Sequence, residues 1–189
     1  PSNYNGFNIS CFGKSDGSID LTITGGTPPY TIEWSNSATT EDISDVPSGY
    51  YSVRVDDSDL LTDPVEAEIT LIEPRLIEID LDAYKYPNDF NISLYGACNG
   101  SIISIVEEGV SPYTFTWSDG ITTLNRTSLC AGEYILLVID ENGCEAKSDP
   151  IRINQPERSD WQMTGNVNTD PNTHFIGTSD NTDMVFKTN

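Results

Sequence analysis

Apolar and polar residues alternate along several short segments of the chain, among them residues 19–23, 30–34 and 51–55. A period of two predicts β-strands that bury one face, and the Gly-, Pro- and Asp-rich stretches between these segments predict turns. No segment of useful length shows the 3.6-residue period of an amphipathic helix. The pattern therefore predicts an all-β protein.

The strand pattern occurs twice. Residues 7–57 align without a gap with residues 90–140, at a constant offset of 83, and 20 of the 51 aligned residues are identical. Such a duplication predicts two copies of one small domain in series. We expect domains at residues 1–74 and 75–157, followed by a separate segment at residues 158–189.

The second repeat begins with a strand-like segment, residues 76–81, for which the first repeat has no counterpart after Pro1. We therefore expect the first strand of the first repeat to lie N-terminal to Pro1, in a longer polypeptide. Further repeats or other domains of the same protein are expected on both sides.

Each repeat carries a tryptophan in one predicted strand (Trp34, Trp117) and a Gly-X-Tyr sequence at the start of another (Tyr51, Tyr134). A buried tryptophan and a tyrosine corner are typical of immunoglobulin-like β-sandwiches. The expected fold class is all-β, with two tandem Ig-like β-sandwich modules and an extended C-terminal tail. We expect the four aromatic side chains in the cores, with a sugar-binding face as the alternative.

The chain carries 30 acidic and 9 basic residues, a net charge of −21. Residues 1–74 contribute −11 and residues 75–157 contribute −8, so the charge belongs to both repeats. Nucleic acid would be repelled, because phosphate binding requires clustered Lys and Arg. The sequence contains no run of about 20 apolar residues, so we expect no membrane insertion.

Residues 11–19 (CFGKSDGSI), 25–34 (GGTPPYTIEW) and 47–51 (PSGYY) together resemble the SprB repeat of long cell-surface proteins of Bacteroidetes, which include gliding-motility adhesins. The second repeat also matches, for example at residues 129–134 (LCAGEY). The resemblance covers residues 4–156. It implies a secreted, repeat-built stalk or adhesin on the bacterial cell surface, and it implies no catalytic residues.

Residues 158–189 do not form a third repeat. Within them, residues 161–166, 170–178 and 183–189 resemble the segment that opens the distal region of fibre proteins with an endosialidase-type intramolecular chaperone. The resemblance implies a lead into a distal fibre region and allows a homo-oligomer through this segment. A flexible linker is the alternative, because the segment is rich in Asn, Thr and Gly.

Four cysteines allow three pairings. Cys98 and Cys130 both occur in the second repeat, whereas their counterparts in the first repeat are Ser15 and Pro47. Joint presence and joint absence are what a bonded pair shows, and an Ig-like strand order places both cysteines at the same end of the module. We predict a Cys98–Cys130 disulfide.

Cys11 and Cys144 are expected at the ends of their modules that face each other. Their counterparts, Leu94 and Leu61, would lie at outer ends, where no second module is present. This pattern fits a disulfide that bridges the modules, and two free or separately paired thiols are the alternative. In either case the cysteines favour an oxidising, extracellular location.

Acidic residues gather at equivalent strand ends, with Asp56, Asp57 and Asp59 in the first repeat and Asp140 in the second. Calcium binds carboxylate oxygens, so calcium is the one cofactor to consider. The spacing is not that of an EF-hand loop, and solvated acidic turns are the alternative.

In the second repeat, Ile135, Leu137 and Ile139 replace three polar residues of the first repeat, so this strand is apolar on both faces. We expect a partner chain or the C-terminal segment to cover its outer face.

His174 is the only histidine, and clustered Cys and His ligands for zinc are missing, so the sequence predicts no enzyme. The preferred function is a non-catalytic stalk that gives reach and mechanical stiffness to a surface adhesin or fibre. The alternative is a repeat that itself binds carbohydrate or calcium. The ligand of the adhesin, a cell surface or a polysaccharide, does not follow from the sequence.

Overall fold

The first repeat folds into five strands: β1 (Gly17–Ile19), β2 (Thr31–Trp34), β3 (Ile43–Val46), β4 (Gly49–Asp56) and β5 (Val65–Leu71). The computed structural model describes residues 1–59 and 63–158. In one layer β1 pairs with β3, and in the other β4 lies between β2 and β5. All these pairs are antiparallel, so the first module is a two-layer β-sandwich.

The second repeat folds into eight strands: β6 (Glu78–Ala83), β7 (Gly100–Glu107), β8 (Thr114–Trp117), β9 (Arg126–Leu129), β10 (Gly132–Tyr134), β11 (Leu136–Ile139), β12 (Glu145–Lys147) and β13 (Ile151–Ile153). One layer has the order β6-β7-β9. The other contains the sheet β8-β11-β12 and the pair β10-β13. The second module is therefore also an antiparallel sandwich, and the predicted tandem Ig-like, all-β architecture is confirmed.

The repeat in the sequence is a repeat in the structure. β8 and β9 begin and end 83 residues after β2 and β3. The eight residues of β4 correspond to β10 and β11 together, which are separated at Ile135. Each module also has a cis X–Pro bond at the same place, before Pro29 and before Pro112.

Each module has a separate hydrophobic core between its layers. Trp34 is buried in the core of the first module and Trp117 in the core of the second. Their indole Nε1–H groups donate to the backbone oxygens of Thr40 (2.9 Å) and Thr123 (2.8 Å), respectively. A buried indole with its N–H satisfied is the arrangement expected of core tryptophans. Because both rings are buried, neither can form a sugar-binding face.

Both modules contain a tyrosine corner. The hydroxyl of Tyr51, which is buried, donates to the backbone oxygen of Pro47 at 2.9 Å. The hydroxyl of Tyr134, which is half-buried, donates to the backbone oxygen of Cys130 at 3.1 Å. This bond to a carbonyl four residues upstream is a hallmark of Ig-like sandwiches.

The modules differ at one edge. In the second module β7 has eight residues and pairs along most of its length with β6. In the first module the corresponding strand, β1, has three residues, and no described strand pairs with residues 20–24. Among the described residues, no strand of the first module corresponds to β6.

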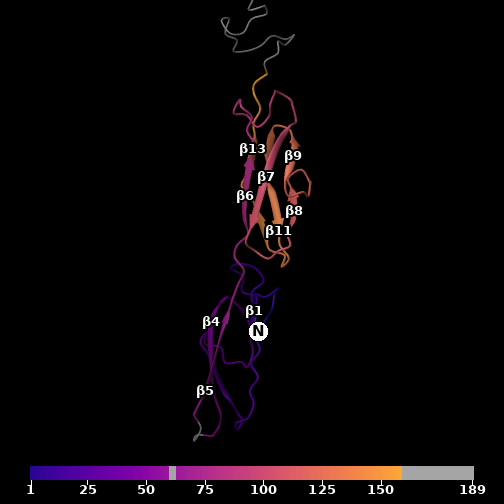
Figure 1. Cartoon of the computed structure of the whole chain (residues 1–189). Coiled ribbons are helices and arrows are strands. Elements are labelled where there is room, and N and C mark those ends of the chain that lie inside the picture. Colours follow the sequence, from indigo (N-terminus) through magenta and orange to yellow (C-terminus); the bar gives the residue numbers. More distant parts are fainter. Residues whose placement is uncertain (60–62, 159–189) are drawn as a thin grey trace, which may run out of the picture.

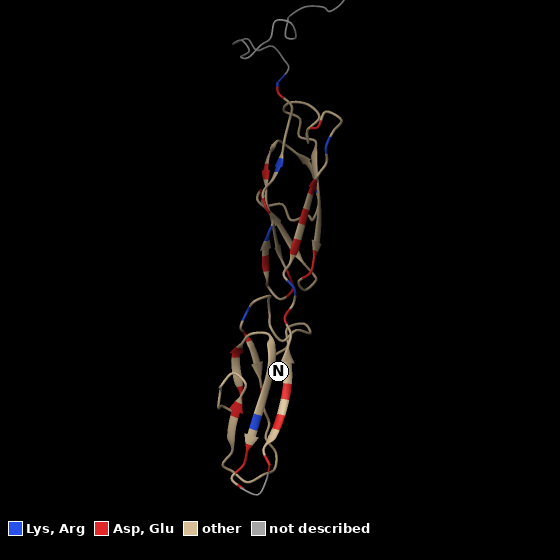
Figure 2. Ribbon diagram, turned by 90° about the vertical axis from the view of Figure 1, so that its left-hand side faces the viewer, with Lys and Arg blue, Asp and Glu red and all other residues tan. Residues whose placement is uncertain are grey.

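The two modules are stacked end to end and together form an elongated body (Figure 1). Acidic residues are spread over both modules and outnumber basic ones (Figure 2). Within the described residues, no helix has the length and apolarity that a membrane crossing requires. The predicted tail comprises residues 158–189, and from residue 159 onward this segment, with its fibre resemblance, lies outside the described residues.

Candidate functional site: the junction of the two modules

A short linker, residues 72–77, leads from β5 to β6 and is held at its start. The backbone oxygen of Ile72 accepts hydrogen bonds from the backbone N–H groups of Asn8 (2.8 Å) and Ile9 (3.2 Å). The side chain of Glu73 accepts a third bond, from the N–H of Gly13 at 2.6 Å. These bonds attach the linker to the first module before the chain crosses to the second.

The linker is also held at its far end. Pro74 and Ile77 are buried, and the backbone oxygen of Arg75 accepts a bond of 3.2 Å from the N–H of Gly109. The Arg75 guanidinium pairs with the carboxylate of Glu108 at 2.9 Å on the surface. An exposed pair of this kind contributes about 0–1 kcal/mol, so burial of the Pro74 and Ile77 side chains holds the linker more strongly than the ion pair does.

A disulfide joins the modules at a second point. Cys11 and Cys144 are bonded, with their Cα atoms 5.6 Å apart and a sequence separation of 133. This Cα separation is typical of disulfides. The structure therefore contains the inter-module bond expected from the repeat comparison, and the junction is crossed by two covalent connections.

Asn142 adds polar contacts beside the disulfide. Its side-chain N–H₂ donates to the backbone oxygens of Ser10 (2.9 Å) and Tyr4 (3.4 Å). Its Oδ1 accepts a bond of 2.7 Å from the side chain of Asn5. All three partners belong to the first module, so Asn142 binds its end loop directly.

An aspartate orders the loop on each side of the disulfide. On the side of the first module, Asp16 accepts bonds from the backbone N–H of Ser10, at 3.0 Å, and from its hydroxyl. Burial raises the pKa of Asp16, but these bonds outweigh that effect and hold the pKa below its ordinary value. On the other side, buried Asp140 accepts from the N–H groups of Cys144 (2.9 Å) and Asn142 (3.0 Å).

Asp140 and Asp57, two of the predicted calcium ligands, have the same structural role. The Oδ2 atom of Asp140 accepts from the N–H of Val110 at 3.0 Å, and that of Asp57 accepts from the N–H of Thr27 at 2.8 Å. Val110 and Thr27 are equivalent residues, 83 apart. In each module this carboxylate connects two loops through backbone donors.

The remaining predicted ligands do not complete a metal site. Asp57 also accepts from the N–H of Asp59 at 3.1 Å, and Asp56 is half-buried at the end of β4. Within residues 1–59 and 63–158, no three His, Cys, Asp or Glu side chains form a group that could hold a metal ion. The structure does not bring Asp140 together with the other three, because it belongs to the other module.

A second disulfide lies within the second module, where Cys98 is bonded to Cys130 across 32 residues of sequence. It connects Cys98, two residues before the start of β7, to the loop between β9 and β10. The first module has no equivalent bond, because Ser15 and Pro47 occupy these positions. Both disulfides of the described chain therefore involve the second module.

Sequence reasoning missed a buried arginine in the second module. Arg126 replaces the core residue Ile43 of the first repeat and is itself buried. Its guanidinium lies 5.4 Å from the ring centre of Trp117 and 5.7 Å from that of Tyr134. It also forms two bonds to the carboxylate of Asp119, at 2.8 and 2.6 Å.

The Arg126 hydrogen bond holds the pKa of Asp119 below its ordinary value, although partial burial acts in the opposite direction. A bidentate guanidinium–carboxylate pair and contacts with two aromatic faces satisfy the buried charge. The exchange of Ile43 for Arg126 between the repeats is the signal that could have revealed this cluster.

Ile135, Leu137 and Ile139 are half-buried. Leu137 and Ile139 alternate along β11 with the buried core residues Leu136 and Val138, so they face away from the core. Neighbouring strands β8 and β12 flank them. The expectation that a partner or the tail covers this face stays a prediction.

The comparisons with known proteins agree with the sequence in part. Residues 7–39, which include β1 and β2, match the model of the SprB repeat family. No curated protein sequence matches the chain. Among solved structures, the amphioxus IgVJ-C2 molecule is similar, with 14% identity, coverage of 75% of this chain and 98% of that chain, and a TM-score of 0.33.

Proposed function

We propose that this chain is a non-catalytic stalk segment of an extracellular surface protein and that its junction keeps two Ig-like modules in a fixed alignment. The observation that carries the proposal is the double covalent connection between the modules. The linker, anchored by buried Pro74 and Ile77, provides one connection, and the Cys11–Cys144 disulfide provides the other.

Two connections restrict motion more than one does. A single linker acts as a hinge, about which domains bend and rotate, and small polar domain interfaces allow such motion by default. A second covalent bond at a separate point of the junction removes most of these rotations. The Asn142 contacts with Ser10 and Tyr4 oppose the remaining twist.

The match of residues 7–39 to the SprB repeat supports a surface location, and both disulfides fit an oxidising environment. From the resemblance we further propose a bacterial surface adhesin or fibre, of the kind found in Bacteroidetes and associated with gliding motility. In such a protein these modules would hold a distal binding region away from the cell. The acidic surface keeps an extended protein soluble.

The test is whether the two modules tumble as one body. Residual dipolar couplings would be measured by NMR on the oxidised chain and on a Cys11→Ser/Cys144→Ser variant. We expect a single alignment tensor to fit both modules of the oxidised chain and two different tensors to be required for the variant. A Cys98→Ser/Cys130→Ser variant is the matched control, because it removes a disulfide without touching the junction.

The proposal of a stiff junction would be wrong if the oxidised chain itself required two tensors. It would also be wrong if the Cys11→Ser/Cys144→Ser variant still behaved as one body, because the disulfide would then not be what aligns the modules.

A further inference from the structure

The disulfide between the modules determines which residues a pulling force can extend. Cys11 and Cys144 have a sequence separation of 133, yet the bond holds their Cα atoms 5.6 Å apart. A force that acts on the chain before Cys11 and after Cys144 is transmitted along the shortest covalent path. That path crosses the S–S bond and leaves out residues 12–143.

Most of the sandwich structure lies in the enclosed part. Strands β1 to β11 fall between the two cysteines in sequence, and so does the linker at residues 72–77. The core tryptophans, Trp34 and Trp117, are enclosed as well. Because the two ends of this part are joined to each other, a force along the chain cannot pull them apart while the bond is intact.

The loaded part of the first module, residues 1–11, is anchored close to the disulfide. The backbone N–H groups of Asn8 and Ile9 donate to the backbone oxygen of Ile72, at 2.8 and 3.2 Å. The Oδ1 atom of Asn8 accepts a third bond, of 3.0 Å, from the N–H of Ile72. Ile9 is fully buried in the first core. The force therefore enters through a segment that is fixed to the folded module.

The loaded part of the second module, residues 144–158, is held by an equivalent set of bonds. The backbone oxygen of Asn154 accepts from the N–H groups of Asn91 (3.0 Å) and Ile92 (3.1 Å). The Oδ1 atom of Asn91 accepts from the N–H of Asn154 at 3.0 Å. Asn91 is 83 residues after Asn8, so both modules use the same clamp. Strands β12 and β13, which precede this clamp, pair with β11 and β10.

We propose that the Cys11–Cys144 bond carries tension past the cores of both modules, so that the pair acts as a link of limited extension. This mechanical function rests on the proposed stalk role, in which the chain is pulled along its length. Of the described residues, only the two loaded segments can extend, to about 90 Å when fully stretched. The enclosed residues would otherwise add about 440–480 Å.

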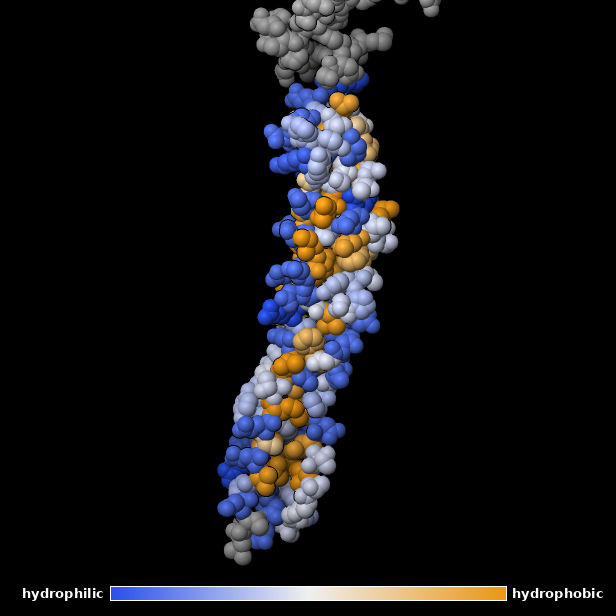
Figure 3. Space-filling model, in the orientation of Figure 1, coloured by the Kyte–Doolittle hydropathy of each residue, from blue (hydrophilic) through white to orange (hydrophobic). Residues whose placement is uncertain are grey.

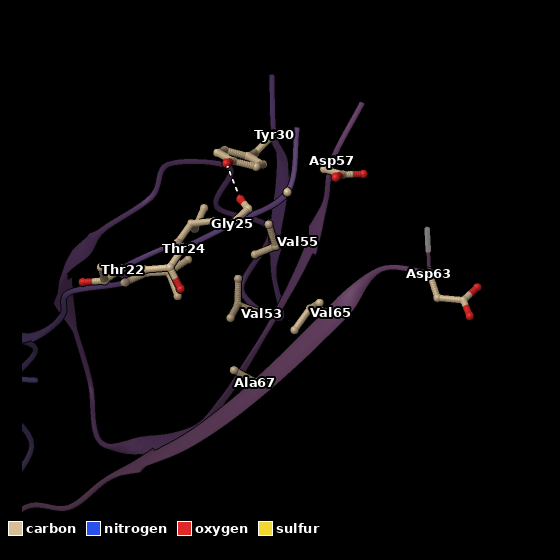
Figure 4. A pocket seen from close by; sticks show the side chains of 13 residues that line it. Thr22, Thr24, Gly25, Tyr30, Val53, Val55, Asp57, Asp63, Val65 and Ala67 are labelled. Atoms are coloured by element: carbon tan, nitrogen blue, oxygen red, sulfur yellow. Dashed lines mark hydrogen bonds between the residues drawn. The ribbon is translucent and has the colours of Figure 1, made fainter. Parts of the chain in front are cut away.

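Surface features of both modules belong to the enclosed part. Hydrophobic residues are visible on the surface of both modules (Figure 3), and the exposed ones of the second module include Ile103 and Ile105. The first module has an open apolar groove of about 420 Å³ between residues 21–26, β4 and β5, and Figure 4 shows Val53 and Val65 facing it. The residues that form these surfaces are not stretched while the bond is intact.

The bond also affects recovery after the load has detached a segment. The enclosed residues then remain a closed loop, because their ends stay joined. Closing a loop lowers the entropy of the unfolded chain, which favours the return to the folded state. A link of this kind therefore limits extension and also assists refolding.

The test is single-molecule force spectroscopy on the full chain, with a handle at each end. We expect a Cys11→Ser/Cys144→Ser variant to extend about 330–360 Å further than the oxidised parent. The reason is that the sequence separation closed by a disulfide falls from 133 to 32, which is the loop closed by the remaining bond. Residues 159–189 are common to all chains and do not affect this difference.

A Cys98→Ser/Cys130→Ser variant is the matched control. Both residues lie between Cys11 and Cys144 in sequence, so loss of their bond should not lengthen the oxidised chain. When all four cysteines are replaced, the same loss should add about 105–115 Å to the extension of the Cys11→Ser/Cys144→Ser variant. The effect of the inner bond therefore depends on whether the outer bond is present.

A second measurement does not depend on the folding of any variant. The oxidised parent is held at constant force, and a phosphine reductant is added, which supplies the two electrons that convert each disulfide into two thiols. We expect the molecule to lengthen by a total of about 440–480 Å once both bonds have opened.

The proposal is overturned if the oxidised parent extends as far as the Cys11→Ser/Cys144→Ser variant, or if reductant does not lengthen it. It is also overturned if Cys98→Ser/Cys130→Ser alone lengthens the oxidised chain, because the force would then pass through the enclosed residues. These outcomes are separate from the NMR test. Two alignment tensors for the oxidised chain would disprove the stiff junction and leave the load path unchanged.

Discussion

The carboxylate of Asp140 accepts a hydrogen bond of 2.9 Å from the backbone N–H of Cys144, the residue that forms the disulfide with Cys11 of the other module. The same Oδ1 atom accepts from the N–H of Asn142, whose side chain contacts the first module. One buried carboxylate therefore holds the turn from which both the disulfide of Cys144 and the hydrogen bonds of Asn142 reach the first module.

Replacement of Asp140 by alanine should destabilise the second module by about 2–4 kcal/mol, because one buried and two partly buried backbone N–H groups lose their acceptor. Urea unfolding, monitored by hydrogen–deuterium exchange in each module, measures this loss of stability. Glu141→Ala is the matched control, because Glu141 is exposed and adjacent. An equal effect of both variants would contradict this role of Asp140.

Asp57→Ala should lower the free energy of unfolding of the first module by a smaller amount, about 1–2 kcal/mol. Asp57 is only half-buried, and its loop does not touch the junction. The same unfolding measurement, applied to the first module, tests this difference. A larger loss for Asp57→Ala than for Asp140→Ala would show that burial does not set the cost.

Most of the architecture followed from the sequence because the repeat provided an internal alignment. The offset of 83 placed the strands of the second module, and the exchange of Ser15 for Cys98 and of Pro47 for Cys130 indicated which cysteines pair. Alternation of apolar residues indicated the core face, and Trp34 lies in it.

Other features depend on contacts between distant residues and could not be found in this way. Acidic residues at a strand end look alike whether they bind calcium or backbone N–H groups, and only the loop geometry shows that Asp140 does the latter. The open apolar groove between residues 21–26, β4 and β5 of the first module exists only once these segments are folded together, so the order of residues along the chain does not reveal it.

Cys98→Ser/Cys130→Ser should lower the stability of the second module by about 3–4 kcal/mol, because closing a loop of 32 residues removes entropy from the unfolded chain. The first module should be unaffected, since it has no part in this bond. Thermal unfolding, monitored by hydrogen–deuterium exchange in each module, measures the stability of the two modules separately. An equal loss in both modules would mean that they unfold as a single cooperative unit.

Removal of divalent cations should leave the unfolding midpoint unchanged. The carboxylate oxygens of Asp57 and Asp140 already accept backbone N–H groups, and no three His, Cys, Asp or Glu side chains of the described residues form a group that could hold a metal ion. Calorimetry with EDTA, and again after excess calcium, provides the comparison. A midpoint that falls with EDTA and recovers with calcium would revive the calcium-binding alternative.

The Arg126–Asp119 pair should make part of the stability of the second module depend on pH. Asp119 has a folded-state pKa below its unfolded value, so its contribution is present above the unfolded pKa and is lost as pH falls through the folded one. Because the Asp119 side chain is 39% exposed, we expect a contribution of only about 1 kcal/mol after solvent screening.

The pH dependence can be isolated with Asp119→Asn, which keeps the size of the side chain and removes its charge. At pH 7 the variant should be less stable than the parent chain, and the difference should disappear as pH falls below the folded-state pKa of Asp119. The first module has Asn36 and Ile43 at these positions, so its stability should show no such dependence on pH. Urea unfolding of both chains between pH 2 and 7 tests this, and a difference that persists at the lowest pH would show that the charge of Asp119 is not its source.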